Sequence, residues 1–429
     1  MSPTRKKLTW DGITSLFSLG VMGLSGLATN IVIVRGWNTE TLGLFNQLFA
    51  LYVFTSMLGA FGIQSSALKY IAEYDDRPEE QASLFASGLA LVLAFASLAV
   101  LTLAFLSPAV GVLFSSPDMR LGTLLILPGI WANAVNKFLL CSLNARLRLR
   151  TYAFLTAMRF ALIPLSATFL LMLGSAGFAV CLCLCIAELI TLAALVCANV
   201  DLIRQGRQRL VRAWAVRHFH FGRRAVLGGM AVELNSRIDI LLLGVFASES
   251  EVGIYSFAAL LFEGLMHLPL LARRFVDPLL AQWVAARRLD DLTKLIRSSC
   301  KHGVWLVGAG FLAAALLYPW FARLAGGNSP LEAGYPALLI LLGLGFLPGI
   351  GAILANFPAQ AGYPGAQSRL SLITLAVNLV LGLILIPPFG IIGAALAVGT
   401  GLLIGLAEQA RLIRSQLNRL YICPAAENQ

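Results

Sequence analysis

The sequence predicts an all-α polytopic membrane protein with twelve transmembrane helices in two six-helix lobes related by a parallel pseudo-two-fold repeat. Three observations lead to this prediction: a composition that is 58% hydrophobic and only 12% charged, a series of long apolar stretches, and basic residues gathered in alternate connections. A soluble domain carries roughly 25% charged residues. Backbone groups in lipid must be hydrogen-bonded within the segment, so the apolar stretches are expected to be helices.

The apolar stretches follow one another along the whole chain. A segment of about 20 apolar residues crosses the hydrocarbon core, and 18 or more with few charges are typical of a transmembrane helix. The expected spans are 13–35, 42–65, 83–105, 121–143, 153–173, 177–198, 225–246, 252–271, 303–321, 336–358, 368–386 and 389–409.

Lysine and arginine are distributed unevenly between the two sides that these spans define. Of the 32 basic residues, 26 lie in the N-terminus, in the even-numbered loops and in the C-terminus. The opposite connections hold only Arg35, Arg120 and Arg323. Because basic residues remain on the cytoplasmic side, both termini are expected in the cytoplasm. The net charge of +11 therefore indicates contact with anionic inner-leaflet lipids rather than with nucleic acid.

Two basic segments, 204–224 and 273–301, are amphipathic and contain aromatic residues, so we expect them on the inner leaflet. No cofactor or metal is expected. His218 and His220 have no acidic or cysteine neighbour, and the cysteines of 181–185 stand two residues apart, a spacing that does not converge on one ion along a helix. The sequence has no phosphate-binding P-loop.

The two halves of the chain share short patterns. Gly43 in the segment 35–45 aligns with Gly253 in the segment 247–257 at an offset of 210 residues, and the glycine turns 174–177 and 390–393 align with an offset of 216. Six spans in each half put both repeats in the same orientation. We therefore expect an N-terminal lobe (1–198), a basic cytoplasmic linker (199–224), and a C-terminal lobe with a cytoplasmic tail (225–429), with an alternating-access cavity between the lobes.

Three patches carry a family resemblance. They are RGWNTETLGLF (35–45) with FGIQSSALKYIAEY (61–74), RIDILLLG (237–244) with SEVGIYSFA (250–258), and NLVLGLILIPPFGIIGAALA (378–397). In this order, on a twelve-span frame, the chain resembles the polysaccharide-repeat-unit flippases of the multidrug/oligosaccharidyl-lipid/polysaccharide exporter superfamily. Lipid II flippases of that superfamily typically have fourteen spans, so that subgroup fits less well.

The resemblance implies a V-shaped alternating-access transporter and no enzyme activity. Such a flippase moves undecaprenyl-pyrophosphate-linked oligosaccharide repeat units from the cytoplasmic to the periplasmic leaflet of the bacterial inner membrane, for surface polysaccharides such as O-antigen or exopolysaccharide. Its expected partners are the lipid-linked oligosaccharide, anionic lipids and polysaccharide assembly proteins.

Candidate substrate-binding residues are the cations within spans. Each such charge costs roughly 2.5–3.5 kcal/mol on insertion scales, so it needs a role or a partner. Lys137, Arg159 and Arg237 are expected to form an electropositive wall, with Asn133 beside Lys137. The resemblance adds Arg35 at the outer end of the first span. For Lys137 and Arg159 the alternative is that the side chains reach the inner headgroups.

Candidate ion-coupling residues are the carboxylates within spans: Glu188, Glu233, Asp239 and Glu263. Glu233 and Arg237 are expected to be neighbours on one helix face at i and i+4. On the same helix Asp239 would point about 200° away from Arg237 and would need a partner elsewhere. A purely structural role in helix packing is the alternative.

Two other functions remain open. A cation-coupled multidrug-type antiporter of the same superfamily would be expected to line its cavity with carboxylates and aromatic residues. The spans of the first half carry Lys137, Arg159 and Glu188, a net charge of +1, which favours an anionic substrate. A membrane polysaccharide polymerase or ligase is disfavoured, because the outer loops at 106–120 and 322–335 are too short and too poor in charge to hold a reaction centre.

Overall fold

The computed structural model describes residues 3–206, 210–286, 288–327, 329–360 and 364–422. Within these ranges the chain is helical and forms no β-strand. It divides into two compact units, Met1–Leu234 (unit 1) and Asn235–Gln429 (unit 2). Each unit is described by itself.

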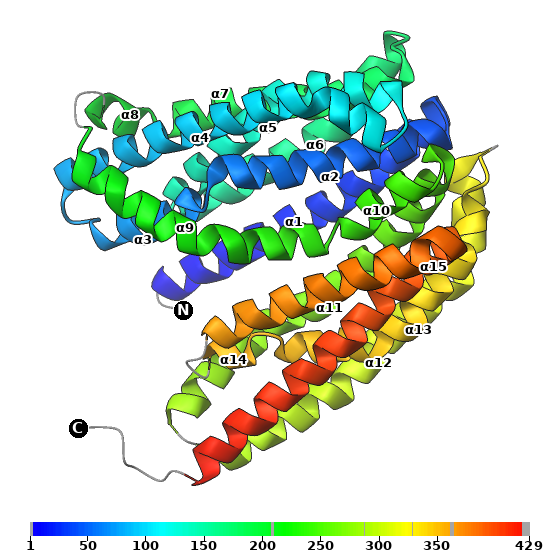
Figure 1. The fold of residues 1–429 in the computed structure, drawn as a ribbon. Coiled ribbons are helices and arrows are strands. Elements are labelled where there is room, and N and C mark those ends of the chain that lie inside the picture. Colours follow the sequence, from blue (N-terminus) through cyan, green and yellow to red (C-terminus); the bar gives the residue numbers. More distant parts are fainter. Residues whose placement is uncertain (1–2, 207–209, 287, 328, 361–363, 423–429) are drawn as a thin grey trace. The chain divides into compact units, whose positions relative to one another are not determined.

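Unit 1 is a bundle built around one central helix, α5 (Figure 1). This helix packs against α2, α4 and α7, while α1 pairs with α6. Its Phe138 is fully buried against Phe85 of α4. The elements are α1 (Pro3–Gly36), α2 (Thr39–Ala60), α3 (Ile63–Glu73), α4 (Pro78–Leu113), α5 (Pro117–Ala145), α6 (Leu149–Met172), η1 (Gly177–Cys181), α7 (Leu182–Ala198), α8 (Val200–Gly206) and α9 (Arg212–Asn235).

Local sequence signals set several helix ends in unit 1. Asn38 caps α2, because its side-chain oxygen accepts a hydrogen bond from the Thr41 amide at 2.8 Å. Phe61 and Gly62 adopt left-handed backbone angles (φ 49° and 70°) and end that helix. The span expected at 42–65 is therefore shorter than predicted at its end, and α3 follows as a separate helix.

Helix α9 packs closely on the turn between α2 and α3 through two glycines. A Cβ atom on Gly222 would lie 2.5 Å from the carbonyl oxygen of Phe61, and one on Gly62 would lie 2.7 Å from the carbonyl oxygen of Gly222. Phe219 stacks on Phe61 and Phe95, with ring centres 5.6 and 6.2 Å apart. Residues 199–224, expected as a linker, thus form α8 and the first half of α9, except that 207–209 lie outside the described residues.

His218 of α9 is fully buried against α3 and α4. Its Nε2 lies 3.1 Å from the carbonyl oxygen of Leu84, which can only accept, so Nε2 carries the proton. Its Nδ1 lies 2.5 Å from Ser66 Oγ and accepts from that hydroxyl. Burial lowers the pKa of His218 to about 4.

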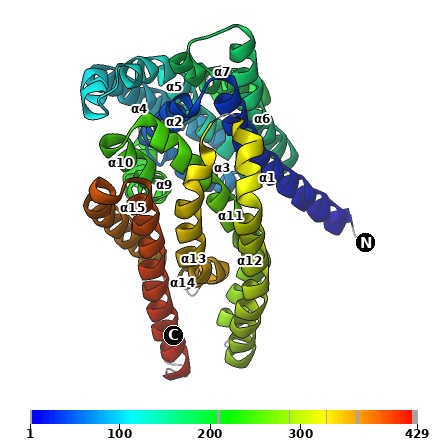
Figure 2. The same cartoon turned by 90° about the vertical axis from the view of Figure 1, so that its right-hand side faces the viewer.

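Unit 2 contains a second set of long helices (Figure 2). Helix α13 packs between α12 and α15, and α10 packs on α15. Residues 273–301, expected as a basic segment on the inner leaflet, end α11 and begin α12, with Arg287 outside the described residues. The elements are α10 (Ile238–Phe246), α11 (Glu249–Ala285), α12 (Leu289–Gly326), η2 (Leu331–Gly334), α13 (Tyr335–Gly351), η3 (Ala352–Leu354), α14 (Phe357–Gln360) and α15 (Pro364–Ile422).

Helix α15 covers both spans predicted at 368–386 and 389–409. Gly390 interrupts it with φ 51° and ψ −128°, angles that are not helical. The two segments then pack closely, because a Cβ on Gly401 would overlap the side chain of Asn378. Asn378 in turn donates to Asn235 Oδ1 at 2.7 Å.

Nine helices within the described residues are long and apolar enough to cross a membrane, and one of these, Arg369–Leu417, has 49 residues. A shorter apolar segment, Gly20–Gly36, lies within the first predicted span. The span predicted at 225–246 is broken, because α9 ends at Asn235 and α10 begins at Ile238. The protein is a multi-pass, all-helical membrane protein; the number of twelve spans and the internal repeat stay predictions.

Candidate functional site

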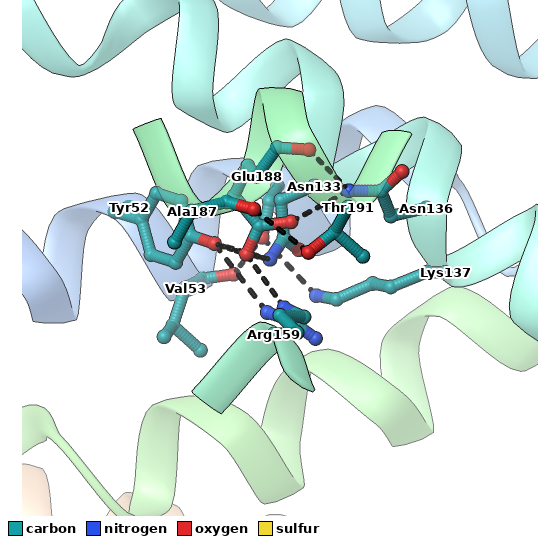
Figure 3. Close-up of polar contacts among 10 residues, drawn as sticks. Tyr52, Val53, Asn133, Asn136, Lys137, Arg159, Ala187, Glu188 and Thr191 are labelled. Carbon is teal, nitrogen blue, oxygen red and sulfur yellow. Dashed lines mark hydrogen bonds and ion pairs between the residues drawn. The ribbon is translucent and has the colours of Figure 1, made fainter. Parts of the chain in front are cut away.

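Five polar side chains from four helices meet inside unit 1 (Figure 3). They are Tyr52 of α2, Asn133 and Asn136 of α5, Arg159 of α6 and Glu188 of α7, called here the Glu188 cluster. Each residue lies near the middle of a long apolar helix. The packing of α2, α6 and α7 around α5 brings them together.

Glu188 is the acceptor at the centre of this cluster. Its Oε1 accepts hydrogen bonds from Tyr52 OH at 2.5 Å, from Asn133 Nδ2 at 2.9 Å and from Arg159 Nε at 2.6 Å. Its Oε2 accepts from Asn136 Nδ2 at 2.7 Å. Asn133 also donates to the Tyr52 hydroxyl. Both carboxylate oxygens are thus held by donors.

Burial makes this arrangement necessary. Glu188 is only 1% exposed. A carboxylate removed from water is stable only when it is paired and hydrogen-bonded, and the guanidinium of Arg159 supplies the opposite charge. The structure therefore pairs the two charges directly.

Lys137 is a second cation beside the cluster. It follows Asn136 on α5, is partly buried, and donates to Ser56 Oγ of α2 at 3.1 Å. Within the described part of the chain it forms no ion pair. Glu188 and Arg159 neutralise one another, while Lys137 interacts electrostatically with the carboxylate of Glu233 on α9 without forming an ion pair with it.

Unit 2 brings other predicted residues together. Arg237, just before α10, forms an ion pair with Glu263 of α11 at 3.2 Å. Asp239 of α10 accepts a hydrogen bond from the Tyr255 hydroxyl at 2.6 Å. Asp239 was predicted to need a partner elsewhere, and Tyr255 on α11 is that partner.

The predicted helical pairing of Glu233 with Arg237 was wrong in its geometry. Glu233 lies in α9, whereas Arg237 follows the end of that helix at Asn235 and has φ −138° and ψ −4°. The two residues are therefore not i and i+4 on one continuous helix face. Glu233 is partly buried near the end of α9, and Arg35 is exposed in the last turn of α1.

The sequence predicted Asn133, Arg159 and Glu188 as site residues and missed Tyr52. A single tyrosine in an apolar helix has no distinguishing pattern. Asn136 stands three residues after Asn133, on the same helix face, so this spacing was a signal for a shared partner. Tyr255 was missed for the same reason as Tyr52.

The comparisons with known proteins agree with this architecture. The family model described as "Polysaccharide biosynthesis protein" matches residues 9–265, more than half of the chain. A curated relative, the probable low-salt glycan biosynthesis flippase Agl15 of Haloferax volcanii, is 24% identical over 197 residues. That match spans 46% of this chain and 42% of the relative, less than half of the relative's length.

Two solved structures show the same fold. An inward-facing multidrug resistance MATE family transporter of the MOP superfamily matches with a TM-score of 0.79 and 14% identity, covering 96% of this chain and 99% of that one. The lipid II flippase MurJ in an inward closed conformation matches with a TM-score of 0.76 and 13% identity, covering 98% and 94%. The predicted family resemblance is confirmed, and the chain belongs to the polysaccharide biosynthesis protein family.

Proposed function

We propose that the protein is a flippase that moves undecaprenyl-pyrophosphate-linked oligosaccharide repeat units across the bacterial inner membrane for surface polysaccharide biosynthesis, and that it is not an enzyme. The family and the flippase relative support the glycan pathway. The proposed topology has both termini in the cytoplasm, as the distribution of basic residues indicates.

The observation that carries the proposal is the pair of cations at the Glu188 cluster, Lys137 and Arg159. Lys137 and Arg159 lie at mid-helix positions where a charge is costly, and Lys137 forms no ion pair in the described part of the chain. A pyrophosphate that leaves the headgroup region loses hydration, and preplaced cations replace part of it. Asn133 is a further proposed substrate-binding residue of the Glu188 cluster, and Arg35 of α1 and Arg237 of unit 2 complete the proposed set.

The proposed mechanism is alternating access between the lobes 1–198 and 225–429, joined by 199–224. The proposed coupling residues are Asp239, Glu263 and Glu233. Each is a carboxylate within or next to a predicted span, where a proton or a cation would change the local charge.

The basic surface of unit 1 supports the proposed contact with anionic lipids. The guanidinium carbon of Arg217 lies 4.7 Å from the ring centre of Tyr70 and 5.1 Å from that of Trp214. Arginine with tryptophan and tyrosine is the combination found at the headgroup level of membranes.

One specific observation favours a second candidate, a cation-coupled antiporter. Asp239 and Glu263 are acidic residues of unit 2, and a multidrug transporter shares the fold. An organic cation would need such carboxylates.

Deletion of the gene followed by lipid analysis tests the proposal. A flippase predicts that lipid-linked repeat units accumulate on the cytoplasmic leaflet and that the surface polysaccharide is lost. An unchanged lipid pool combined with increased sensitivity to cationic drugs would favour the antiporter instead.

A further inference from the structure

The guanidinium of Arg159 is held by one edge. Its Nε donates to Glu188 Oε1 at 2.6 Å, and one terminal nitrogen, Nη2, lies 3.4 Å from the Tyr52 hydroxyl. The other terminal nitrogen, Nη1, has no hydrogen-bond partner in the described part of the chain. The side chain keeps 14% of its surface exposed, whereas Glu188 keeps 1%.

This geometry differs from the usual fork-to-fork ion pair. When arginine and a carboxylate only neutralise one another, two guanidinium nitrogens commonly bind the two carboxylate oxygens in parallel. Here the second oxygen of Glu188 accepts from Asn136, and the guanidinium contacts the cluster through Nε and, over a longer distance, through Nη2 to the Tyr52 hydroxyl. Nη1 is left to face a ligand.

Lys137 lies near this open edge. Figure 3 shows its ammonium group on the side of the cluster where Arg159 enters, and the two cations are close enough to interact electrostatically. A planar donor fork next to a point charge is suited to phosphate oxygens.

We propose that Glu188 is a positioning residue: it binds Arg159 through Nε and thereby aims the terminal guanidinium nitrogens, beside Lys137, at the pyrophosphate group of the lipid-linked substrate. This inference rests on the proposed function and gives Glu188 a role other than ion coupling. Tyr52, Asn133 and Asn136 hold the carboxylate in place.

A simpler role makes the opposite prediction. If Glu188 only neutralised Arg159, its replacement by glutamine would remove a negative charge near the site, and an anion would bind more tightly. If Glu188 positions Arg159, the same change releases the guanidinium and the anion binds more weakly. The sign of the effect therefore separates the two roles.

The experiment measures the dissociation constant of farnesyl pyrophosphate, a short lipid pyrophosphate, for the purified full-length protein by calorimetry. Glu188→Gln is expected to weaken binding about ten- to hundredfold, the range for losing a hydrogen bond with a charged group. Glu188→Asp keeps the charge but shortens the side chain, and it is expected to weaken binding at least tenfold. Wild-type or tighter binding by either folded variant overturns the inference.

Two further variants keep the test decisive. Tyr52→Phe retains every charge and removes a hydroxyl that contacts both Glu188 and Arg159, so weaker binding is expected even if the Glu188 variants do not fold. Thr191→Val is the matched control on α7, because Thr191 Oγ1 donates only to Ala187 of its own helix. Unchanged binding by Tyr52→Phe, with both Glu188 variants unfolded, also overturns the inference.

Combination with Arg159→Gln tests whether Glu188 acts through Arg159. In that background Glu188→Gln should cause no further loss, and an equal loss would contradict the positioning role. If Lys137→Gln and Arg159→Gln both leave binding unchanged, the proposed pyrophosphate site itself fails. If Lys137→Gln and Arg159→Gln weaken binding and the Glu188 variants do not, the pyrophosphate site stands and only the positioning role of Glu188 fails.

Discussion

The two units surround their buried carboxylates differently. In unit 1, Glu188 is 1% exposed and accepts from four side chains, one of them a cation. In unit 2, Asp239 is 8% exposed and the side chain that donates to it is the neutral Tyr255, while Arg237 and Glu263 form a pair that is 20% and 28% exposed. The carboxylate of unit 1 is thus held by more side-chain donors than those of unit 2, whose greater exposure agrees with the proposed coupling role.

The largest expected effect is on the stability of unit 1. Arg159→Gln leaves the buried Glu188 without its opposite charge, which should lower the free energy of unfolding by about 3–5 kcal/mol. Thermal unfolding of the purified protein measures this loss. The double variant Arg159→Gln/Glu188→Gln should regain most of the stability but not the transport. A double variant that transports normally would contradict the proposed role of the Glu188 cluster in transport.

Acid should destabilise the packing of α9 against α3 and α4 within unit 1. Because burial lowers the pKa of His218 to about 4 from an ordinary value near 6.5, the undocked helix binds the proton more readily between these values. The stabilisation is complete above pH 6.5 and falls as the pH drops toward 4, by at most about 3 kcal/mol.

Hydrogen exchange over α9 measures this effect, with His218→Gln as the control. In unit 2, His302 of α12 is exposed to solvent in the folded state, so α12 serves as the reference helix and should show little change over the same pH range. Equal acid sensitivity of α9 and α12 would contradict the assignment to His218.

A glycine substitution tests the same contact without changing charge. Gly222→Ala places a Cβ 2.5 Å from a backbone oxygen of Phe61, which cannot rotate away, so a loss of about 1–3 kcal/mol is expected. The matched control is Gly343→Ala in α13, where no atom lies within 4 Å of the added Cβ. Thermal unfolding compares the two, and equal stabilities would show that α9 is not tightly packed.

The smallest stability effect is expected in unit 2. Arg237→Gln removes a partly exposed ion pair, so the loss should be about 1 kcal/mol or less. Transport should fall in this variant if Arg237 binds substrate. Because the structure pairs Arg237 with Glu263, the double variant Arg237→Gln/Glu263→Gln is the appropriate control. A loss of stability as large as that of Arg159→Gln would remove the contrast between the units.

The sequence predicted the helices better than their breaks. The span predicted at 121–143 lies within Pro117–Ala145, because a long apolar run in lipid has to be helical. The break between α9 and α10 was missed, although the polar run Asn235-Ser236-Arg237 marks its position. A hydropathy average over a whole span hides such a short polar run. The break itself depends on which helices α9 and α10 pack against.

The candidate site was predicted in part for a similar reason. Arg159 and Glu188 were identifiable because charges within apolar helices are costly. The contacts of Glu188 with Arg159 and Tyr52 depend on how α2, α6 and α7 pack around α5, and no residue spacing in the sequence predicts that packing.

The most direct test of the central claim, that the cations beside the Glu188 cluster bind the substrate, is the leaflet distribution of lipid-linked repeat units in cells expressing Lys137→Gln. This change removes the positive charge while leaving the Arg159–Glu188 pair intact. We predict normal expression and accumulation of the lipid-linked sugar on the cytoplasmic leaflet, with Arg369→Gln, which alters an exposed cation of α15, behaving as wild type. A normal leaflet distribution in Lys137→Gln cells would contradict the account.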